Sequence, residues 1–168
     1  LDEYPESVFG YRYRDKTHIM RFKNKSQIVF RSIESIRDVG KIQGLEYQFM
    51  IIDEANRHER RVITRMLGSL RGPRGHIFVP TVLMTGNPGG LADLYFKSRF
   101  VEVDYSEWTK QELKNKDKYK FIPAKLEDNE YVNEEYLGHL EEQDEATRRA
   151  WRDGDWNSYM GQFFTEWN

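Results

Sequence analysis

The sequence predicts an α/β domain, in which strands alternate with helices. Short apolar runs at 48–52 and 79–84 each end in polar residues, and between them apolar residues recur at helical spacing over 56–70. Strands that alternate with helices are typical of a parallel sheet. Two β-rich runs, 17–22 and 27–30, flank a turn-forming Asn-Lys pair, so we expect an antiparallel hairpin at the side of that sheet.

The composition is that of a folded domain. The chain has 168 residues, of which 32% are charged and 14% are aromatic, a balance typical of globular proteins. Its 26 Lys and Arg residues against 28 Asp and Glu residues give a net charge of −2, so no overall basic character points to nucleic acid. The absence of cysteine excludes disulfides and Cys-ligated zinc and favours an intracellular protein. No apolar run approaches membrane-spanning length, so no membrane partner is expected.

The remaining elements follow from periodicity and local composition. The strand at 48–52 is expected to be buried on both faces, as strands of parallel sheets are. The helix predicted at 56–70 ends at a Gly-Pro segment. Further along we expect a short helix at 91–100, strands at 100–104 and 119–123, an exposed charged loop or helical turn at 110–118, and one long amphipathic helix at 134–152 followed by an aromatic tail.

Two adjacent carboxylates follow the first apolar strand. Asp53 and Glu54 would emerge at its carboxyl end, where open α/β sheets bind ligands. This is the layout of a Walker B element, in which the first carboxylate holds Mg²⁺ and the second orients or deprotonates the attacking water. The alternative is a strand followed by an acidic first helical turn, because Asp and Glu are favoured at that position.

A small polar turn follows the second apolar strand. Thr85, Gly86 and Asn87 can lie beside Asp53 and Glu54 if the two strands are neighbours, and a polar group there can sense a γ-phosphate or the attacking water. Glycine at the centre allows a tight turn with close backbone approach. The alternative is a generic turn, because every residue type in this segment is a common turn former.

The sequence contains no lysine-bearing phosphate loop of the form Gly-x-x-x-x-Gly-Lys-Ser/Thr. Such a loop holds the β- and γ-phosphates of a bound nucleotide. Two explanations remain open. Either the chain is part of a longer protein whose upstream segment carries the loop, or the ATPase interpretation of the Asp-Glu pair is wrong. The absence of an initiator methionine favours the first.

An ordered series of segments carries a resemblance to a known family. The series consists of the hairpin runs, IIDEA at 51–55, TGNP at 85–88, IPAKLEDN at 122–129, and the closing runs RRAW at 148–151, GDW at 154–156 and GQFF at 161–164. Together they resemble the ATPase domain of the large subunit of viral and bacteriophage DNA-packaging terminases. The resemblance covers nearly the whole chain from about residue 17.

The resemblance implies a fold, an activity and a set of roles. The fold would be a P-loop NTPase of the RecA/ASCE type, with a central sheet flanked by helices. ATP and Mg²⁺ would be the cofactors, Asp53 the Mg²⁺ carboxylate and Glu54 the catalytic glutamate. Thr85, Gly86 and Asn87 would form the coupling motif, which relays hydrolysis to a movement that grips DNA.

The resemblance also implies a domain organisation. Residues 1–168 would be a partial ATPase domain, with the phosphate loop upstream of Leu1 and a nuclease domain downstream. The helix and aromatic tail of 134–168 would lead toward that nuclease domain. The parent protein would be an ATPase, whereas the 168-residue piece alone would hydrolyse little or no ATP, because the phosphate loop is missing.

Partners and location follow from the same resemblance. The parent would translocate double-stranded DNA into a procapsid as a homo-oligomeric ring on the capsid portal, together with the terminase small subunit. It would work in the host cell cytoplasm, at the procapsid during assembly.

A trans-acting arginine is harder to assign. Many relatives carry arginine just before the glycine that corresponds to Gly44, but this chain has Gln43 there. The candidates for an arginine finger or a DNA contact are Arg37, Lys41, Arg57 and Arg71. The alternative for the arginines at 57–74 is a solvated helix face.

Two other functions remain open at this stage. One is a helicase-like ATPase fragment, because helicases share the Asp-Glu-Ala run. The other is a non-catalytic module for DNA binding or oligomerisation that uses the arginines and the aromatic tail.

Overall fold

The computed structural model describes residues 10–72, 75 and 78–159. The chain divides after Asp38 into two units, and each is described by itself. The closing GQFF segment and part of the predicted Gly-Pro segment lie outside the described residues.

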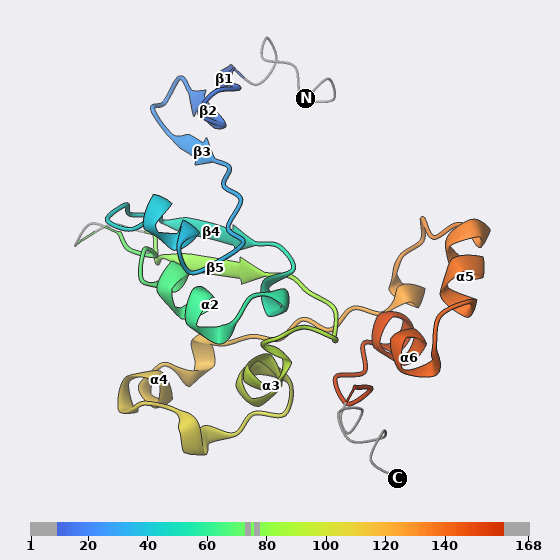
Figure 1. Cartoon of the computed structure of the whole chain (residues 1–168). Coiled ribbons are helices and arrows are strands. Elements are labelled where there is room, and N and C mark those ends of the chain that lie inside the picture. Colours follow the sequence, from blue (N-terminus) through green and yellow to red (C-terminus); the bar gives the residue numbers. More distant parts are fainter. Residues whose placement is uncertain (1–9, 73–74, 76–77, 160–168) are drawn as a thin grey trace. The chain divides into compact units, whose positions relative to one another are not determined.

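The N-terminal unit is a three-stranded antiparallel sheet in the order β1-β2-β3 (Figure 1). Its strands are β1 Tyr11–Arg14, β2 Ile19–Phe22 and β3 Gln27–Val29. The predicted hairpin is confirmed as β2 and β3, and its turn closes where the Lys25 amide donates to the Phe22 carbonyl at 3.0 Å. β1 was not predicted, and it pairs with β2 through Tyr11 opposite Phe22. Among the described strands, the hairpin therefore pairs with β1 and not with the parallel sheet.

The second unit contains the predicted parallel strands. β4 Phe49–Ile52 and β5 Thr81–Met84 pair in parallel, with Ile52 opposite Met84. A short 3₁₀ helix, η1 Asp38–Lys41, precedes β4. Phe49 lies opposite Thr81 and Ile52 opposite Met84, so both strands end at the same level. Their carboxyl ends therefore lie side by side.

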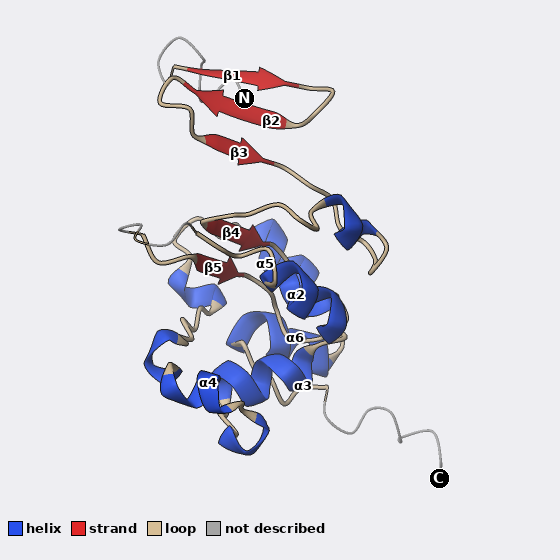
Figure 2. Cartoon of the chain, turned by 90° about the vertical axis from the view of Figure 1, so that its left-hand side faces the viewer, coloured by secondary structure: helices blue, strands red, loops and turns tan. Residues whose placement is uncertain are grey.

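One face of this sheet is covered by α2 Arg60–Leu67 (Figure 2). Val62, Ile63 and Met66 are buried on that helix, as the helical spacing predicted. The predicted helix at 56–70 is shorter than expected. Residues 55–57 form a separate 3₁₀ turn, η2 Ala55–Arg57, and the helix ends at Gly68.

The other face of the sheet carries exposed apolar side chains. Phe49 is 57% exposed, Ile51 61% and Leu83 44%. The prediction that the strand at 48–52 is buried on both faces is therefore wrong for the described chain. Its alternate residues, Met50 and Ile52, face the covered side.

The segment after β5 is helical and aromatic. α3 Asp93–Phe96 continues as a π-helical turn, η3 Lys97–Val101, and is followed by η4 Tyr105–Glu107, α4 Lys110–Lys114 and η5 Lys116–Lys118. The strands predicted at 100–104 and 119–123 are wrong. Phe100 and Tyr119 instead pack together, with ring centroids 6.1 Å apart, and Tyr119 also packs against Trp108.

The C-terminal helix predicted over 134–152 is two helices. They are α5 Glu134–Glu141 and α6 Glu145–Asp153, preceded by a 3₁₀ turn, η6 Leu126–Asp128. Asp144 divides them, because its carboxylate caps α6 by accepting from the Thr147 amide at 3.0 Å and from the Thr147 hydroxyl at 2.6 Å. No helix in the described ranges is long and apolar enough to span a membrane.

Candidate active site

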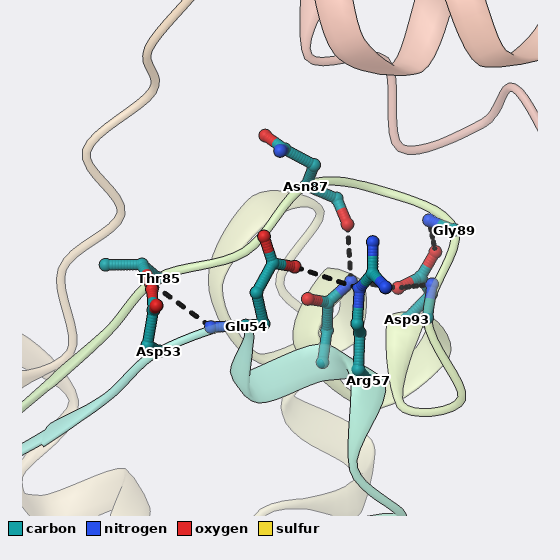
Figure 3. Close-up of polar contacts among 9 residues, drawn as sticks. Asp53, Glu54, Arg57, Thr85, Asn87, Gly89 and Asp93 are labelled. Carbon is teal, nitrogen blue, oxygen red and sulfur yellow. Dashed lines mark hydrogen bonds and ion pairs between the residues drawn. The ribbon is translucent and has the colours of Figure 1, made fainter.

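Thr85 joins the two strand ends. Its hydroxyl donates to Oδ1 of Asp53 at 2.5 Å and accepts from the Glu54 amide at 3.3 Å (Figure 3). The backbone reinforces the contact, because the Thr85 amide donates to the Ile52 carbonyl at 3.0 Å and the Ala55 amide donates to the Thr85 carbonyl at 2.8 Å. The carboxylate pair and the Thr-Gly-Asn turn, which are 31 to 32 positions apart in sequence, therefore form one site.

Glu54 occupies a left-handed backbone conformation, with φ 49° and ψ 42°. This region is unfavourable for a residue with a Cβ, and non-glycine residues there cluster at functional sites. The conformation turns the chain sharply after β4 and separates the Glu54 side chain from that of Asp53. The Glu54 carboxylate then accepts from Nε of Arg57 at 3.1 Å, with both side chains partly exposed.

Asn56 lies behind the exposed edge and is fully buried. Its Nδ2 donates to the Asn87 carbonyl at 2.6 Å and to Oδ1 of Asp93 at 2.7 Å. Both partners are acceptors, so the orientation of the amide is fixed by them. Asn87 itself is exposed: its backbone oxygen is directed inward and its side chain outward (Figure 3).

Asp93 caps the loop that follows Asn87. Its carboxylate accepts from the Gly89 amide at 2.5 Å and from the Gly90 amide at 2.9 Å. Gly89 has φ 117°, which favours glycine, and the ring of Tyr159 lies against it. The 85–90 segment is therefore held at Thr85, at Asn87 and at its two last glycines.

The basic candidates lie in different parts of the chain. Arg57 lies in the site through its ion pair with Glu54. Arg71 lies near the amino-terminal end of β4, because its amide donates to the carbonyl of Tyr47, just before that strand. That position is roughly 20 Å along the strand from Asp53.

Lys41 and Arg37 lie before β4. The segment with Lys41 is attached to the end of α2, where the Ser69 hydroxyl donates to the Ile42 carbonyl at 3.2 Å. Arg37 belongs to the N-terminal unit. Of the four candidates, the structure therefore brings only Arg57 together with Asp53 and Glu54 among the described contacts.

Several arginines around α2 have carboxylate partners. Arg60 lies 3.6 Å from Glu107, and Arg61 lies 2.5 Å from Glu59. With the Arg57–Glu54 pair, three of the arginines at 57–74 have a carboxylate partner. Exposed ion pairs of this kind are weak, so they hold the arginine side chains only loosely. The nearby carboxylates still reduce the positive charge around α2.

The donor atoms at the site are hard oxygens. Asp53 and Glu54 offer carboxylates and Thr85 a hydroxyl, which is the chemistry that Mg²⁺ prefers. Within the described ranges, no group of three or more His, Cys, Asp or Glu residues could hold a metal ion alone. A magnesium ion held at these strand ends would take one or two protein carboxylates and complete its shell with other oxygen ligands.

A hollow of about 380 Å³ lies elsewhere, between η6 and the last two helices. Leu126, Val132, Leu137 and Arg152 are among the residues that line it. It shares none of its lining with the strand ends. At the strand ends, Asp53 and Thr85 are exposed and Glu54 is half-buried, so the candidate chemistry faces solvent.

Sequence reasoning missed Asn56 and Asp93. Asn56 is the first residue of the predicted helix, and a polar residue at that position gave no sign of a buried role. The sequence did contain a signal for Asp93. It is an acidic residue that follows a Gly-Gly pair and lies at the start of a predicted helix, and carboxylates at such positions accept hydrogen bonds from free backbone amides.

Comparison with known proteins gives the family. A family model described as "Phage terminase large subunit" matches residues 12–154. The match covers most of the chain, including both strand ends and every helix from α2 to α6. Searches of curated proteins and of solved structures each found no match. The family match agrees with the series of motifs in the sequence, and the chain belongs to the phage terminase large subunit family.

Proposed function

We propose that this chain supplies the Walker B and coupling edge of the ATPase that drives phage DNA packaging. Family membership supports a role in DNA packaging. The observation that carries the catalytic part is the Thr85 hydroxyl, which contacts Asp53 and the amide of Glu54 at the joined carboxyl ends of two parallel strands.

Each residue of the site would have its own role in ATP hydrolysis. With ATP bound, Mg²⁺ neutralises charge on the phosphate oxygens. Asp53 would hold that ion, and Glu54 would orient the attacking water and take its proton. Thr85 would fix the Asp53 carboxylate and keep the Glu54 backbone in its left-handed turn. Asn87 and Gly86 would respond to the reaction as the coupling segment.

The proposed fold is a P-loop NTPase in which further strands extend the β4–β5 pair. Parallel sheets are ordinarily covered on both faces, and here Phe49, Ile51 and Leu83 form an uncovered apolar face. We propose that another part of the same polypeptide supplies that cover together with the phosphate loop. ATP and Mg²⁺ would bind between that loop and the Asp53 edge.

The proposed partners are those of a packaging motor. They are double-stranded DNA, identical subunits in a ring on the capsid portal, and the terminase small subunit, in the host cytoplasm at the procapsid. A purely DNA-binding module is less well supported, because Arg57, Arg60 and Arg61 are each paired with carboxylates. Arg57 remains the candidate for a trans-acting contact at the site.

The test is Glu54→Ala in the whole protein that carries this sequence. We expect ATP hydrolysis to fall by about 100-fold or more, because a group needed in the transition state is lost. DNA affinity should change by less than about threefold, since the variant touches no phosphate contact. Glu59→Ala, which removes a nearby exposed carboxylate, is the matched control and should leave hydrolysis unchanged.

The opposite pattern would support the binding module. In that case Glu54→Ala has no effect on hydrolysis, whereas substitution of Arg57 or Arg71 weakens DNA binding and lowers its salt dependence. A protein with no nucleotide-dependent activity in either form would overturn the ATPase proposal.

A further inference from the structure

The buried carboxamide of Asn56 connects three parts of the site. Asn56 follows Glu54 by two positions, and its own carbonyl accepts from the Ala92 amide at 2.8 Å. Its Nδ2 reaches the Asn87 carbonyl in the coupling segment and the Asp93 carboxylate at the start of α3. One fully buried side chain, on the turn that follows Asp53 and Glu54, thus contacts both the candidate coupling segment and the start of the next helix.

Two glycines are required by the close approach of Asn56, one to its side chain and one to its backbone. A Cβ on Gly86 would lie 2.1 Å from Oδ1 of Asn56, and a Cβ on Gly90 would lie 2.3 Å from the Asn56 carbonyl oxygen. Neither glycine has a positive φ, so backbone conformation does not explain their lack of a side chain. Close approach to Asn56 does.

The two ends of the buried amide have different surroundings. Among the described residues, Nδ2 of Asn56 has two hydrogen-bond acceptors and Oδ1 has no hydrogen-bond donor. This oxygen lies against Gly86, the central residue of the candidate coupling motif.

We propose that Asn56 is a positioning residue for the hydrolysis proposed above, on which this inference rests. It fastens the 85–90 segment to the Asp53–Glu54 turn, so that the Thr85 hydroxyl meets both members of the carboxylate pair. It also links that segment to Asp93, so that a displacement of the coupling segment moves the start of α3. Asn56 touches no reacting atom in this role.

The first test is kinetic, in the whole protein. Asn56→Ala should lower kcat for ATP by about 10- to 100-fold, as expected when catalytic groups are misplaced, while ATP affinity stays within about threefold. Gly86→Ala should lower kcat similarly, because its methyl group displaces the same amide. The double variant should be no slower than Asn56→Ala alone, because removal of the amide makes room for the methyl group.

Val62→Ala is the matched control for lost stability. Val62 is buried on α2 and contacts none of the site groups by hydrogen bonds, so its truncation should lower the melting temperature and leave kcat unchanged. If Asn56→Ala and Gly86→Ala lower kcat no more than Val62→Ala does, the proposal is wrong. If Asn56→Ala does not fold, Asp93→Asn decides, because it alters the same contact from a half-buried side chain, and an unchanged kcat would overturn the proposal.

The second test does not need hydrolysis. Amide hydrogen exchange of the wild-type chain should show protection at Gly89, Gly90 and Ala92, and Asn56→Ala should raise their exchange rates by about tenfold or more. Amides of β2 and β3 in the N-terminal unit should be unaffected. Unchanged exchange at these three amides would refute the fastening role.

The outcomes separate this inference from the proposed function. Wild-type hydrolysis in Glu54→Ala would overturn the ATPase proposal itself. Loss of hydrolysis in Glu54→Ala with normal kcat and normal exchange in Asn56→Ala would overturn only the role of Asn56.

Discussion

The Thr85 hydroxyl donates a hydrogen bond to the Asp53 carboxylate across the ends of two parallel strands, at 2.5 Å. Hydrogen bonds to a carboxylate are about twice as strong as those between neutral groups. This contact therefore orients Asp53 before any ligand binds. It also explains why a threonine suits the first position of the polar turn, where its hydroxyl can donate to one residue and accept from the next.

Removal of this hydroxyl should reduce catalysis more than stability. We expect Thr85→Val to lower ATP hydrolysis by the whole protein by about tenfold, because Asp53 loses its orienting donor. The melting temperature should change little, since the side chain is exposed. Thr85→Ser keeps the hydroxyl and should retain most of the activity, and equal losses in the Val and Ser variants would contradict the role given to the hydroxyl.

The left-handed backbone at Glu54 should be measurable as strain. Glu54→Gly should give a higher free energy of unfolding than Glu54→Ala, by about 1 kcal/mol, because glycine has no Cβ to clash in this region. Urea denaturation of the two variants measures the difference. His58, with φ −80° and ψ 152°, is the control position, and there the Gly variant should be no more stable than the Ala variant.

The stability of the chain should depend on the ion pair between Arg99 and Glu112. The guanidinium of Arg99 is buried, lies 2.8 Å from Glu112 and stacks 5.0 Å over the Trp108 ring. Glu112→Gln should lower the free energy of unfolding by about 3 kcal/mol, since it leaves a buried charge without its counter-charge. The double variant with Arg99→Met should recover part of this loss, and urea denaturation that shows simple additivity would count against a coupled pair.

The same pair predicts a loss of stability in acid. Burial acts to raise the pKa of the Glu112 carboxyl, but hydrogen bonds from Thr109 and the charge of Arg99 together outweigh burial and hold the pKa below its ordinary value. The unfolded chain therefore binds a proton at higher pH than the folded chain does. The stabilisation is complete above the ordinary glutamate pKa and is lost as the pH falls through the folded value.

Thermal unfolding between about pH 6 and about pH 3 measures this effect. The melting temperature of the wild-type chain should fall over the acid part of that range. Glu112→Gln should flatten the fall. Glu134→Gln, which changes an exposed acid at the start of α5, should reproduce the wild-type slope, and an equal flattening in both variants would remove Glu112 from the explanation.

The sequence was informative where local patterns decide the structure. The parallel pairing of β4 with β5 and the polar residues at both carboxyl ends were predicted from short apolar runs. The β2–β3 hairpin was predicted from its flanked turn. Each strand and the turn are local patterns, and the parallel pairing follows from the alternation of strands with helices, so periodicity, turn chemistry and element order were sufficient.

Features that depend on distant contacts were missed. The left-handed conformation of Glu54 and the burial of Asn56 are set by a segment about 30 positions later, which no local pattern reveals. The aromatic residues at 100 and 119 have high β-propensity, but they pack with Trp108 in a ring cluster. Asp144 lay within an otherwise helical pattern, and its capping of α6 by hydrogen bonds to Thr147 divided one predicted helix into two.

The small size of the β4–β5 sheet matters for experiments on the chain in solution. Within the described residues, these two strands pair only with each other, so their outer edges present free main-chain groups beside the exposed rings and branched side chains of Phe49, Ile51 and Leu83. Such edges are templates for the addition of strands from other molecules. Oligomers formed by the purified chain at high concentration would therefore report strand addition at this sheet, and their size would be a poor guide to the number of subunits in a packaging motor.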